Sequence, residues 1–366
     1  MPGLPFRDAE PYLGRMKTSM LTLLLLSSLA VPQAALQYGP ADVDTLPMAD
    51  TQINESAREI IIELPAMEIP AGGMLRTPVH RATIPFDVSI YGFRVEVLDE
   101  YGAVVPEDRL HHFNLTDPDR RELFLPLPLH IMAASKETGS PTVPRLLIGM
   151  PVPAGSRYMA AAMISNPSGA AVRLRPRLIL SFMRPGKIFP LIKAYPWVMD
   201  VKFPNGGEGG RKDFDLPVGK SEYSWESQPA LPGTILGLGG HVHDLATAIE
   251  FKDITADKVI WYQEPQRDDK GTVSYLPPAK LYRWYRLGVH IEPSHVYRVT
   301  VYYNNTTGTP IPWGGMGAVA GLFRPDSGYQ WPGVDVIDPV YLTDMHNLLA
   351  NMVGLEMGHG THHHEP

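Results

Sequence analysis

Residues 88–97 have the sequence Val-Ser-Ile-Tyr-Gly-Phe-Arg-Val-Glu-Val, in which apolar side chains largely alternate with small or polar ones. This period of two is typical of a strand with one buried face. Similar short apolar runs occur at residues 60–62 and 174–182, and Pro or Gly residues separate such runs along the chain. Runs of this length and spacing are typical of a β-sandwich or barrel, so we predict an all-β protein.

The composition agrees with this fold class. The chain has 366 residues, including 37 Pro and 33 Gly, and at about 150 residues per domain this length suggests two domains. Abundant proline disfavours helices. The best helical pattern extends from Pro339 to Met357.

The composition also restricts the chemistry. The chain has 13 His and no Cys, which excludes disulfides, thiolate metal sites and thiol nucleophiles. A metal site must therefore use His, Met, Asp, Glu or backbone ligands. The net charge is −7, with 32 basic and 39 acidic residues, which argues against a nucleic-acid partner.

A glycine-rich segment, Pro-Asn-Gly-Gly-Glu-Gly-Gly-Arg at residues 204–211, is typical of a turning or flexible connection. We use it to divide the chain into two β-domains. The predicted segments are a polar arm (36–57), a first β-sandwich (58–203), a linker (204–219), a second β-sandwich (220–338), and a short helix with a His- and Met-rich tail (339–366).

The N-terminus predicts export. Met16 and Lys17 precede an apolar run from Met20 to Ala30, and small residues suited to cleavage follow at 34–35. The run is too short for a membrane span of about 20 residues. We therefore expect residues 1–35 to be a signal peptide with an upstream extension, and the mature protein to be secreted or periplasmic with no membrane span.

Two histidine pairs and one methionine are candidate metal ligands. On a strand, His241 and His243 point to the same face because one residue separates them. The adjacent His111 and His112 point to opposite faces of a regular strand, so they need a bulge or twist to share a metal. Met316 lies in a Trp-Gly-Gly-Met-Gly segment, and a thioether beside imidazoles selects copper over zinc. Each pattern alone is also typical of ordinary core or surface residues.

Taken together, the order and separation of these motifs resemble the copper type II, ascorbate-dependent monooxygenases, which include peptidylglycine α-hydroxylating monooxygenase and dopamine β-monooxygenase. The resemblance covers roughly residues 58–326. It implies two consecutive jelly-roll sandwiches, each with one copper, facing each other across a cleft. It assigns His111 and His112 to an electron-transfer copper, and His241, His243 and Met316 to the catalytic copper. There, O₂ and an external reductant such as ascorbate would hydroxylate a C–H bond of a small-molecule or peptide substrate.

The chain departs from that family at the first copper. The family has a third histidine there, whereas the matched segment of this chain, residues 157–167, has none. The third ligand of this site is Met163, His130 or absent. We therefore expect one or two copper ions. Asp244 is a candidate partner for a ring N–H of the second pair.

The remaining histidines fall into two groups. Five of the 13 lie in the last 21 residues, at His346, His359, His362, His363 and His364. Such a tail can capture or deliver copper, can be passive, or can supply a ligand to the main site. The other four, which we expect to be packing or loop residues, are His80, His130, His290 and His295.

Three functions remain open. The first is an exported copper monooxygenase. The second is a non-enzymatic copper-binding or copper-handling protein on the same fold, which the missing third histidine and the tail favour. The third is a double jelly-roll binding module with incidental histidines.

Overall fold

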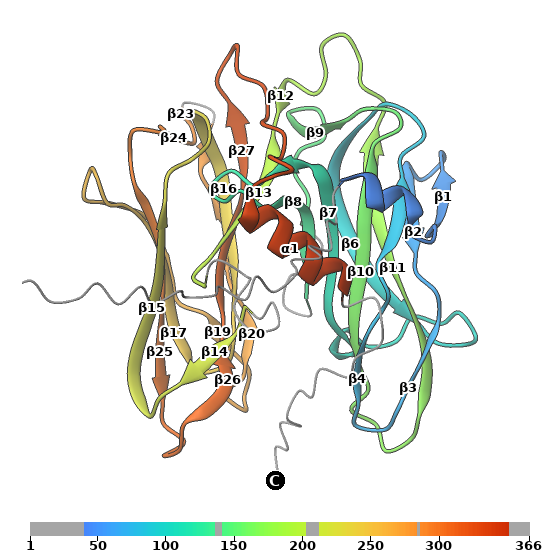
Figure 1. Cartoon of the computed structure of the whole chain (residues 1–366), viewed down its shortest axis with the longest axis vertical. Helices are drawn as coiled ribbons and strands as arrows, with labels where there is room; N and C mark the ends of the chain where they lie inside the picture. Colours follow the sequence, from blue (N-terminus) through green and yellow to red (C-terminus); the bar gives the residue numbers. More distant parts are fainter. Residues whose placement is uncertain (1–39, 136–140, 203–211, 284–285, 351–366) are drawn as a thin grey trace, which may run out of the picture. The chain divides into compact units, whose positions relative to one another are not determined.

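The structure is a computed structural model that describes residues 40–135, 141–202, 212–283 and 286–350 (Figure 1). Within these ranges the chain forms two consecutive jelly-roll β-sandwiches and one α-helix, so the all-β prediction is confirmed. The predicted signal peptide, the tail histidines from His359 onward and the glycine-rich segment at 204–211 lie outside the described residues.

The first sandwich consists of two sheets (Figure 1). One sheet has the order β1 (Asp50–Asn54), β2 (Glu59–Glu63), β11 (Val172–Met183), β6 (Val88–Leu98), β9 (Ile148–Val152) and β12 (Ile192–Lys193), with β3 (Met67–Ile69) also paired to β11. The other has the order β4 (Met74–Arg76), β10 (Arg157–Ser165), β7 (Leu110–Arg121) and β8 (Pro128–Ala134), with β5 (His80–Thr83) also paired to β10.

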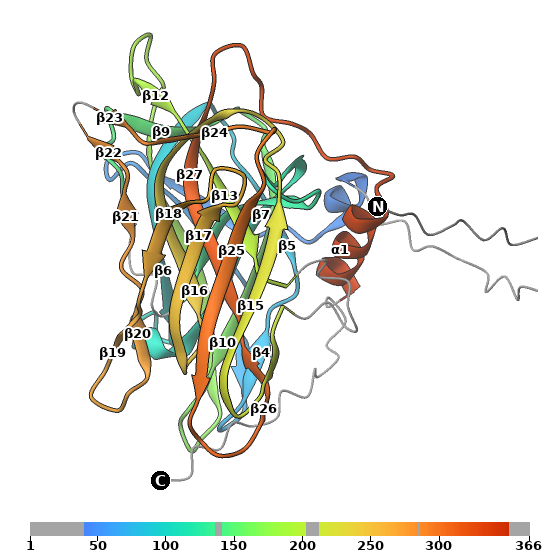
Figure 2. The same ribbon diagram turned by 90° about the vertical axis from the view of Figure 1, so that its left-hand side faces the viewer.

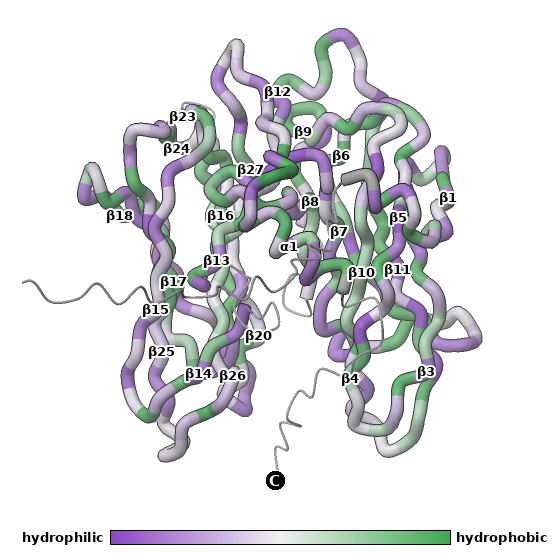
Figure 3. The backbone as a smooth tube through the Cα atoms, viewed as in Figure 1, coloured by the Kyte–Doolittle hydropathy of each residue, from purple (hydrophilic) through white to green (hydrophobic). Residues whose placement is uncertain are grey.

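The predicted strand at residues 88–97 is β6, and the run at 174–182 is its neighbour β11. Apolar side chains of both strands are buried in the core between the two sheets, most clearly at alternate positions of β11. Leu178, Leu180 and Phe182, for example, are at most 1% exposed. The same alternation of apolar and polar residues is visible along the tube in Figure 3.

The second sandwich also has two main sheets (Figure 2). One has the order β13 (Tyr195–Asp200), β27 (Gly317–Pro325), β16 (Gly233–Val242) and β21 (Ala279–Lys280), with β24 (Val289–Ile291) also paired to β16. The other has the order β15 (Gly219–Ser227), β25 (Tyr297–Asn305), β17 (Ala246–Asp253) and β18 (Lys258–Gln263). Smaller pairs are β14 (Phe214–Leu216) with β26 (Ile311–Gly315), β19 (Gln266–Arg267) with β20 (Val273–Tyr275), and β22 (Tyr282–Arg283) with β23 (Arg286–Leu287).

Strand pairing corrects two predicted boundaries. β13 pairs with β27 of the second sandwich, so the chain changes sandwich before residue 195 and not at 203. β1 pairs with β2, so part of the predicted arm at 36–57 belongs to the first sandwich. Both boundaries were inferred from composition, which marks loops but does not show which sheet a strand joins.

The predicted helix is present as α1 (Pro339–Ala350), whose buried side chains Tyr341, Met345 and Leu349 pack with Val79 and Met159 of the first sandwich. A 3₁₀ helix, η1 (Pro40–Thr45), adds Val43 to the same cluster. Among the described residues, no helix is long and apolar enough to cross a membrane.

A shared apolar interface joins the two sandwiches, and residues 37–366 form one compact unit. The segment between β7 and β8 supplies buried side chains to the core of the second sandwich, at Leu123, Phe124, Leu125 and Leu127. Trp331 packs against both cores. This interface fixes β7 of one sandwich relative to β16 of the other, and these two strands carry the candidate ligands.

Candidate metal centre

His111 and His112 lie near the start of β7, where its pairing with β10 is irregular. Met163 of β10 faces His112, and the next residue, Ile164, faces Leu110, so His111 is an extra residue in β7. Such an insertion is a β-bulge, which re-aims side chains. The ring centroids of the two histidines are 4.1 Å apart. The structure therefore contains the bulge that this pair needs to share a metal.

Of the two candidates for a third ligand, only Met163 lies beside this pair. Because it is directly opposite His112 on the neighbouring strand, both side chains are on the same face of the sheet. His130 instead pairs with Thr116, four residues along β7 and so about 13 Å away. The buried Glu122 holds His130: its Oε1 accepts the backbone N–H at 2.7 Å and lies 3.1 Å from Nδ1. The His130 alternative is therefore wrong.

His241 and His243 come at the end of β16. The ladder between β16 and β27 extends to the pair Val242 and Gly317, so the next residues on the two strands, His243 and Met316, are neighbours. The ring centroids of His241 and His243 are 5.2 Å apart. The structure thus brings together the three residues that the resemblance assigns to one copper.

Tyr303 fixes this end of the sheet. Its hydroxyl oxygen accepts the backbone N–H of His243 at 3.2 Å and that of Met316 at 3.0 Å, and its O–H donates to the Met316 carbonyl. Tyr303 lies on β25 and is 2% exposed, and burial raises the pKa of its phenol above the usual range. Sequence reasoning missed this residue because a tyrosine within a strand is typical of an ordinary core residue.

Asp244 lies in the turn after His243, and its predicted contact with a ring N–H stays a prediction. Oδ1 of Asp244 accepts the backbone N–H of Val273 at 2.8 Å, so this carboxylate oxygen anchors the turn. Leu245 in the same turn has a φ of +69°, a left-handed conformation that costs a non-glycine residue free energy. The path of the chain after His243 is therefore closely constrained.

The two histidine pairs meet. The rings of His112 and His241 lie edge to face with centroids 5.5 Å apart. His111, His112, His241 and His243 therefore form one chain of ring contacts, which we call the histidine cluster. Burial and the three neighbouring imidazoles lower the pKa of His112 well below its usual range, so its ring is neutral at pH 7.

Lys212 and Asp200 form a partly buried ion pair. Nζ of Lys212 lies 2.9 Å from Oδ2 of Asp200, which is almost fully buried. Burial alone would lower the pKa of Lys212, but Asp200 raises it above its usual range with help from Asp344 and Glu122. Lys212 therefore stays charged, and it acts electrostatically on His112. Composition placed Lys212 in the linker, so its role beside the cluster was not predicted.

The donor chemistry of the cluster fits copper. Among the described residues, no group of three or more His, Asp or Glu side chains is arranged to hold a metal ion. An imidazole pair together with a thioether would suit Cu(I). Two imidazoles bound to one ion through bonds of about 2.0 Å have ring centroids about 5 Å apart. The contacts of 5.2 and 5.5 Å are close to this value, whereas the contact of 4.1 Å between His111 and His112 is shorter.

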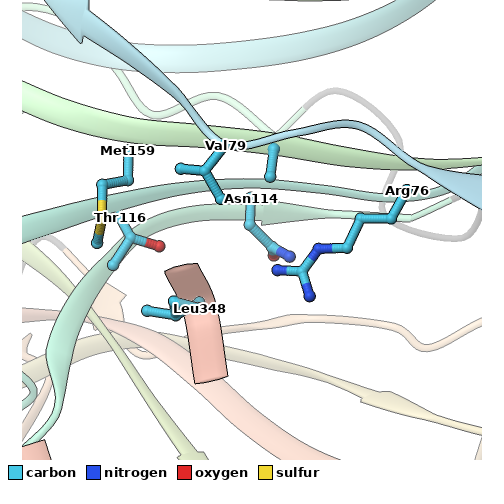
Figure 4. Close-up of a pocket in the computed structure, with 7 residues that line it drawn as sticks. Arg76, Val79, Asn114, Thr116, Met159 and Leu348 are labelled. Carbon is cyan, nitrogen blue, oxygen red and sulfur yellow. The ribbon is translucent and has the colours of Figure 1, made fainter. Parts of the chain in front are cut away.

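Two cavities in the described part of the chain lie apart from the histidine cluster. One, of about 10 Å³, lies beneath α1 between Asn114, Met159 and Leu348 (Figure 4) and has room for about one water. Another, of about 480 Å³, is lined by residues of the first sandwich including Asp99 and Arg109. No histidine of the cluster lines either cavity.

The histidines expected to be packing or loop residues have other partners. Nδ1 of His80 lies 2.9 Å from the Pro78 carbonyl oxygen. His290 pairs with Asp326 at 2.8 Å, and His295 pairs with Asp253 at 2.7 Å. His346, which was grouped with the tail, is on α1. The contacts of His80, His290 and His295 are outside the histidine cluster.

No protein-family model and no curated protein matches this chain. Among solved structures, the major capsid protein P2 of bacteriophage PM2 is similar over 74% of this chain and 100% of that chain, with 8% identity and a TM-score of 0.35. The glycosylasparaginase PNGase F of Flavobacterium meningosepticum is similar over 72% and 97%, with 8% identity and a TM-score of 0.32. Similarities this low carry no argument about this chain, and its fold is established by its own strand pairing.

Proposed function

We propose that this protein is an exported copper-dependent oxidoreductase of the monooxygenase type, with copper bound by His241, His243 and Met316. The observation that carries the proposal is the register at the end of β16, which makes His243 and Met316 neighbours beside His241. The hydrogen bonds of Tyr303 support it, since they tie the backbones of His243 and Met316 together.

The residues have distinct roles in this proposal. A bound copper ion supplies one-electron and O₂ chemistry. His241 and His243 are neutral donors suited to both copper oxidation states, and the Met316 thioether favours the reduced state. His111, His112 and Met163 form the second donor set. The substrate, a small molecule or peptide, would be hydroxylated at a C–H bond, with an external reductant such as ascorbate.

Copper titration tests the binding step. The change is His241 and His243 to Ala, with His290→Ala as the matched control because His290 is on the same sheet but pairs with Asp326. We expect the double substitution to remove the ion bound by His241, His243 and Met316 and so lower the Cu(I) stoichiometry, and the control to retain it. Full copper binding by H241A/H243A would refute the assignment.

A second candidate function is copper binding without catalysis, and the first sandwich favours it. Glu122 holds His130 away from the His111–His112 pair, so the third imidazole of the family's electron-transfer site has no counterpart there. Ascorbate-dependent O₂ consumption separates the candidates: an enzyme consumes O₂ with reductant, whereas a copper-handling protein binds Cu(I) tightly without doing so. A protein that binds no copper would instead support the binding-module hypothesis.

A further inference from the structure

We propose that one copper ion is shared between the two sandwiches, with His112 of β7 and His241 of β16 as the ligands that face each other. This inference rests on the proposed function, but it replaces two separate copper sites with one. The observation behind it is the edge-to-face contact of these two rings, with centroids 5.5 Å apart. That separation is close to the value of about 5 Å for imidazoles bound to one ion.

The third donor is a thioether. Among the described residues, no three His, Asp or Glu side chains are arranged to hold a metal ion, so His111 and His243 are neighbours of the facing pair and not further ligands. Met163, directly opposite His112 on β10, is on the same face of the sheet. A thioether beside two imidazoles suits Cu(I).

The interface holds the facing pair in place. The segment containing Phe124 inserts into the core of the second sandwich, where its ring lies 5.0 Å from that of Trp197. Its carbonyl also accepts the hydroxyl of Ser227 at 2.6 Å. Because this packing fixes the two sandwiches together, His112 and His241 are close through the fold of the protein and need no metal to bring them together.

Charge favours one ion over two. The rings of His111 and His112 are 4.1 Å apart at their centroids, so a second copper ion held on the His111 side would lie close to the first. Two positive ions so close together repel each other more strongly in a partly buried site than in water, because the local dielectric constant is lower.

A double-mutant cycle tests the sharing. The full chain would carry alanine at tail positions His359, His362, His363 and His364, so that the tail does not contribute metal sites. Cu(I) stoichiometry and affinity would be measured by competition with a chromophoric Cu(I) chelator. The variants are His112→Ala, His241→Ala, the two combined, and His290→Ala as control, each checked for folding by circular dichroism.

Sharing predicts one tightly bound Cu(I) per chain. Each single substitution should weaken it by more than the roughly 10–100-fold typical of losing an outer partner, and the double substitution should cost little more than one. Two tight ions, of which each single substitution removes one, would overturn sharing but not copper binding. One tight ion unaffected by H112A would also overturn sharing. Absence of tight copper would overturn both proposals.

A measurement that needs no substitution in the histidine cluster tests the proposal even if a variant does not fold. One equivalent of Cu(I) should shift the ring-proton NMR signals of both His112 and His241. The signals of His290, which is exposed and pairs with Asp326, should not move and serve as the internal control. A shift of the His241 signals without those of His112 would overturn the shared site.

Discussion

Removing the Tyr303 hydroxyl should weaken copper binding as well as the fold. Tyr303→Phe keeps the buried ring but leaves three backbone groups without this partner, the N–H groups of His243 and Met316 and the Met316 carbonyl. At about 1 kcal/mol for each hydrogen bond lost, the cost in unfolding free energy is about 3 kcal/mol. The groups released are those that position His243 and Met316.

Tyr297→Phe is the matched control. Tyr297 lies on the same strand, is 1% exposed, and its hydroxyl accepts the backbone N–H of Glu292 at 3.1 Å. This substitution removes one buried hydroxyl and one hydrogen bond, at a cost of about 1 kcal/mol. It does not touch the histidine cluster. Both costs would be measured by denaturant unfolding of the metal-free proteins.

The deciding assay is Cu(I) affinity at a temperature where both variants are folded. We expect Y303F to lose about 10–100-fold in affinity, as typically follows loss of a group that orients a ligand, and Y297F to match the unsubstituted protein. Equal copper affinity in the two variants would show that Tyr303 is only a core residue. It would also remove the main support for Met316 as a ligand.

Three further outcomes follow from the first sandwich. His130→Ala should leave Cu(I) stoichiometry unchanged because the His130 ring pairs with Glu122. Loss of one equivalent of Cu(I) in the chelator assay would contradict this. Met163→Leu should weaken Cu(I) binding, whereas Met159→Leu, on the same strand beneath α1, should not; equal affinities would exclude the Met163 thioether. Burial alone would raise the pKa of Glu96, but hydrogen bonds from Arg177 and Arg94 lower it below its usual range. Its contribution to stability is therefore present at neutral pH and is lost as pH falls through the folded-state pKa. Glu96→Gln should cost about 1 kcal/mol near pH 7 and little in acid, and an equal cost at both pH values in denaturant unfolding would refute this.

The fold class could be predicted from local patterns because strands with one buried face alternate in sequence. The run at residues 88–97 became β6, paired along its length with β11. Which sheet a strand joins was not predictable in this way. β13 precedes the glycine-rich segment yet pairs with β27, since pairing depends on residues more than one hundred positions away.

The candidate site likewise contains residues that local sequence patterns predict and residues that only tertiary structure brings together. The i, i+2 spacing of His241 and His243 requires only strand geometry, so the sequence sufficed for that pair. The bulge at His111 depends on the partner strand β10. From the sequence we could say that a shared metal needs a bulge at this pair, but we could not predict that one is present. Tyr303 and Lys212 reach the site only through tertiary packing, and no local pattern marks either residue.

A copper ion held between the sandwiches would also affect stability. The chain has no cysteine, so an exported form of it cannot gain stability from disulfides. A ligand that binds only the folded state stabilises it by about 2.7 kcal/mol at 100 times its dissociation constant. A shared ion would cross-link β7 and β16 and so resist separation of the sandwiches, whereas an ion bound within one sandwich would stabilise that sandwich alone. Copper should therefore raise the unfolding temperature of both sandwiches together if His112 and His241 share it.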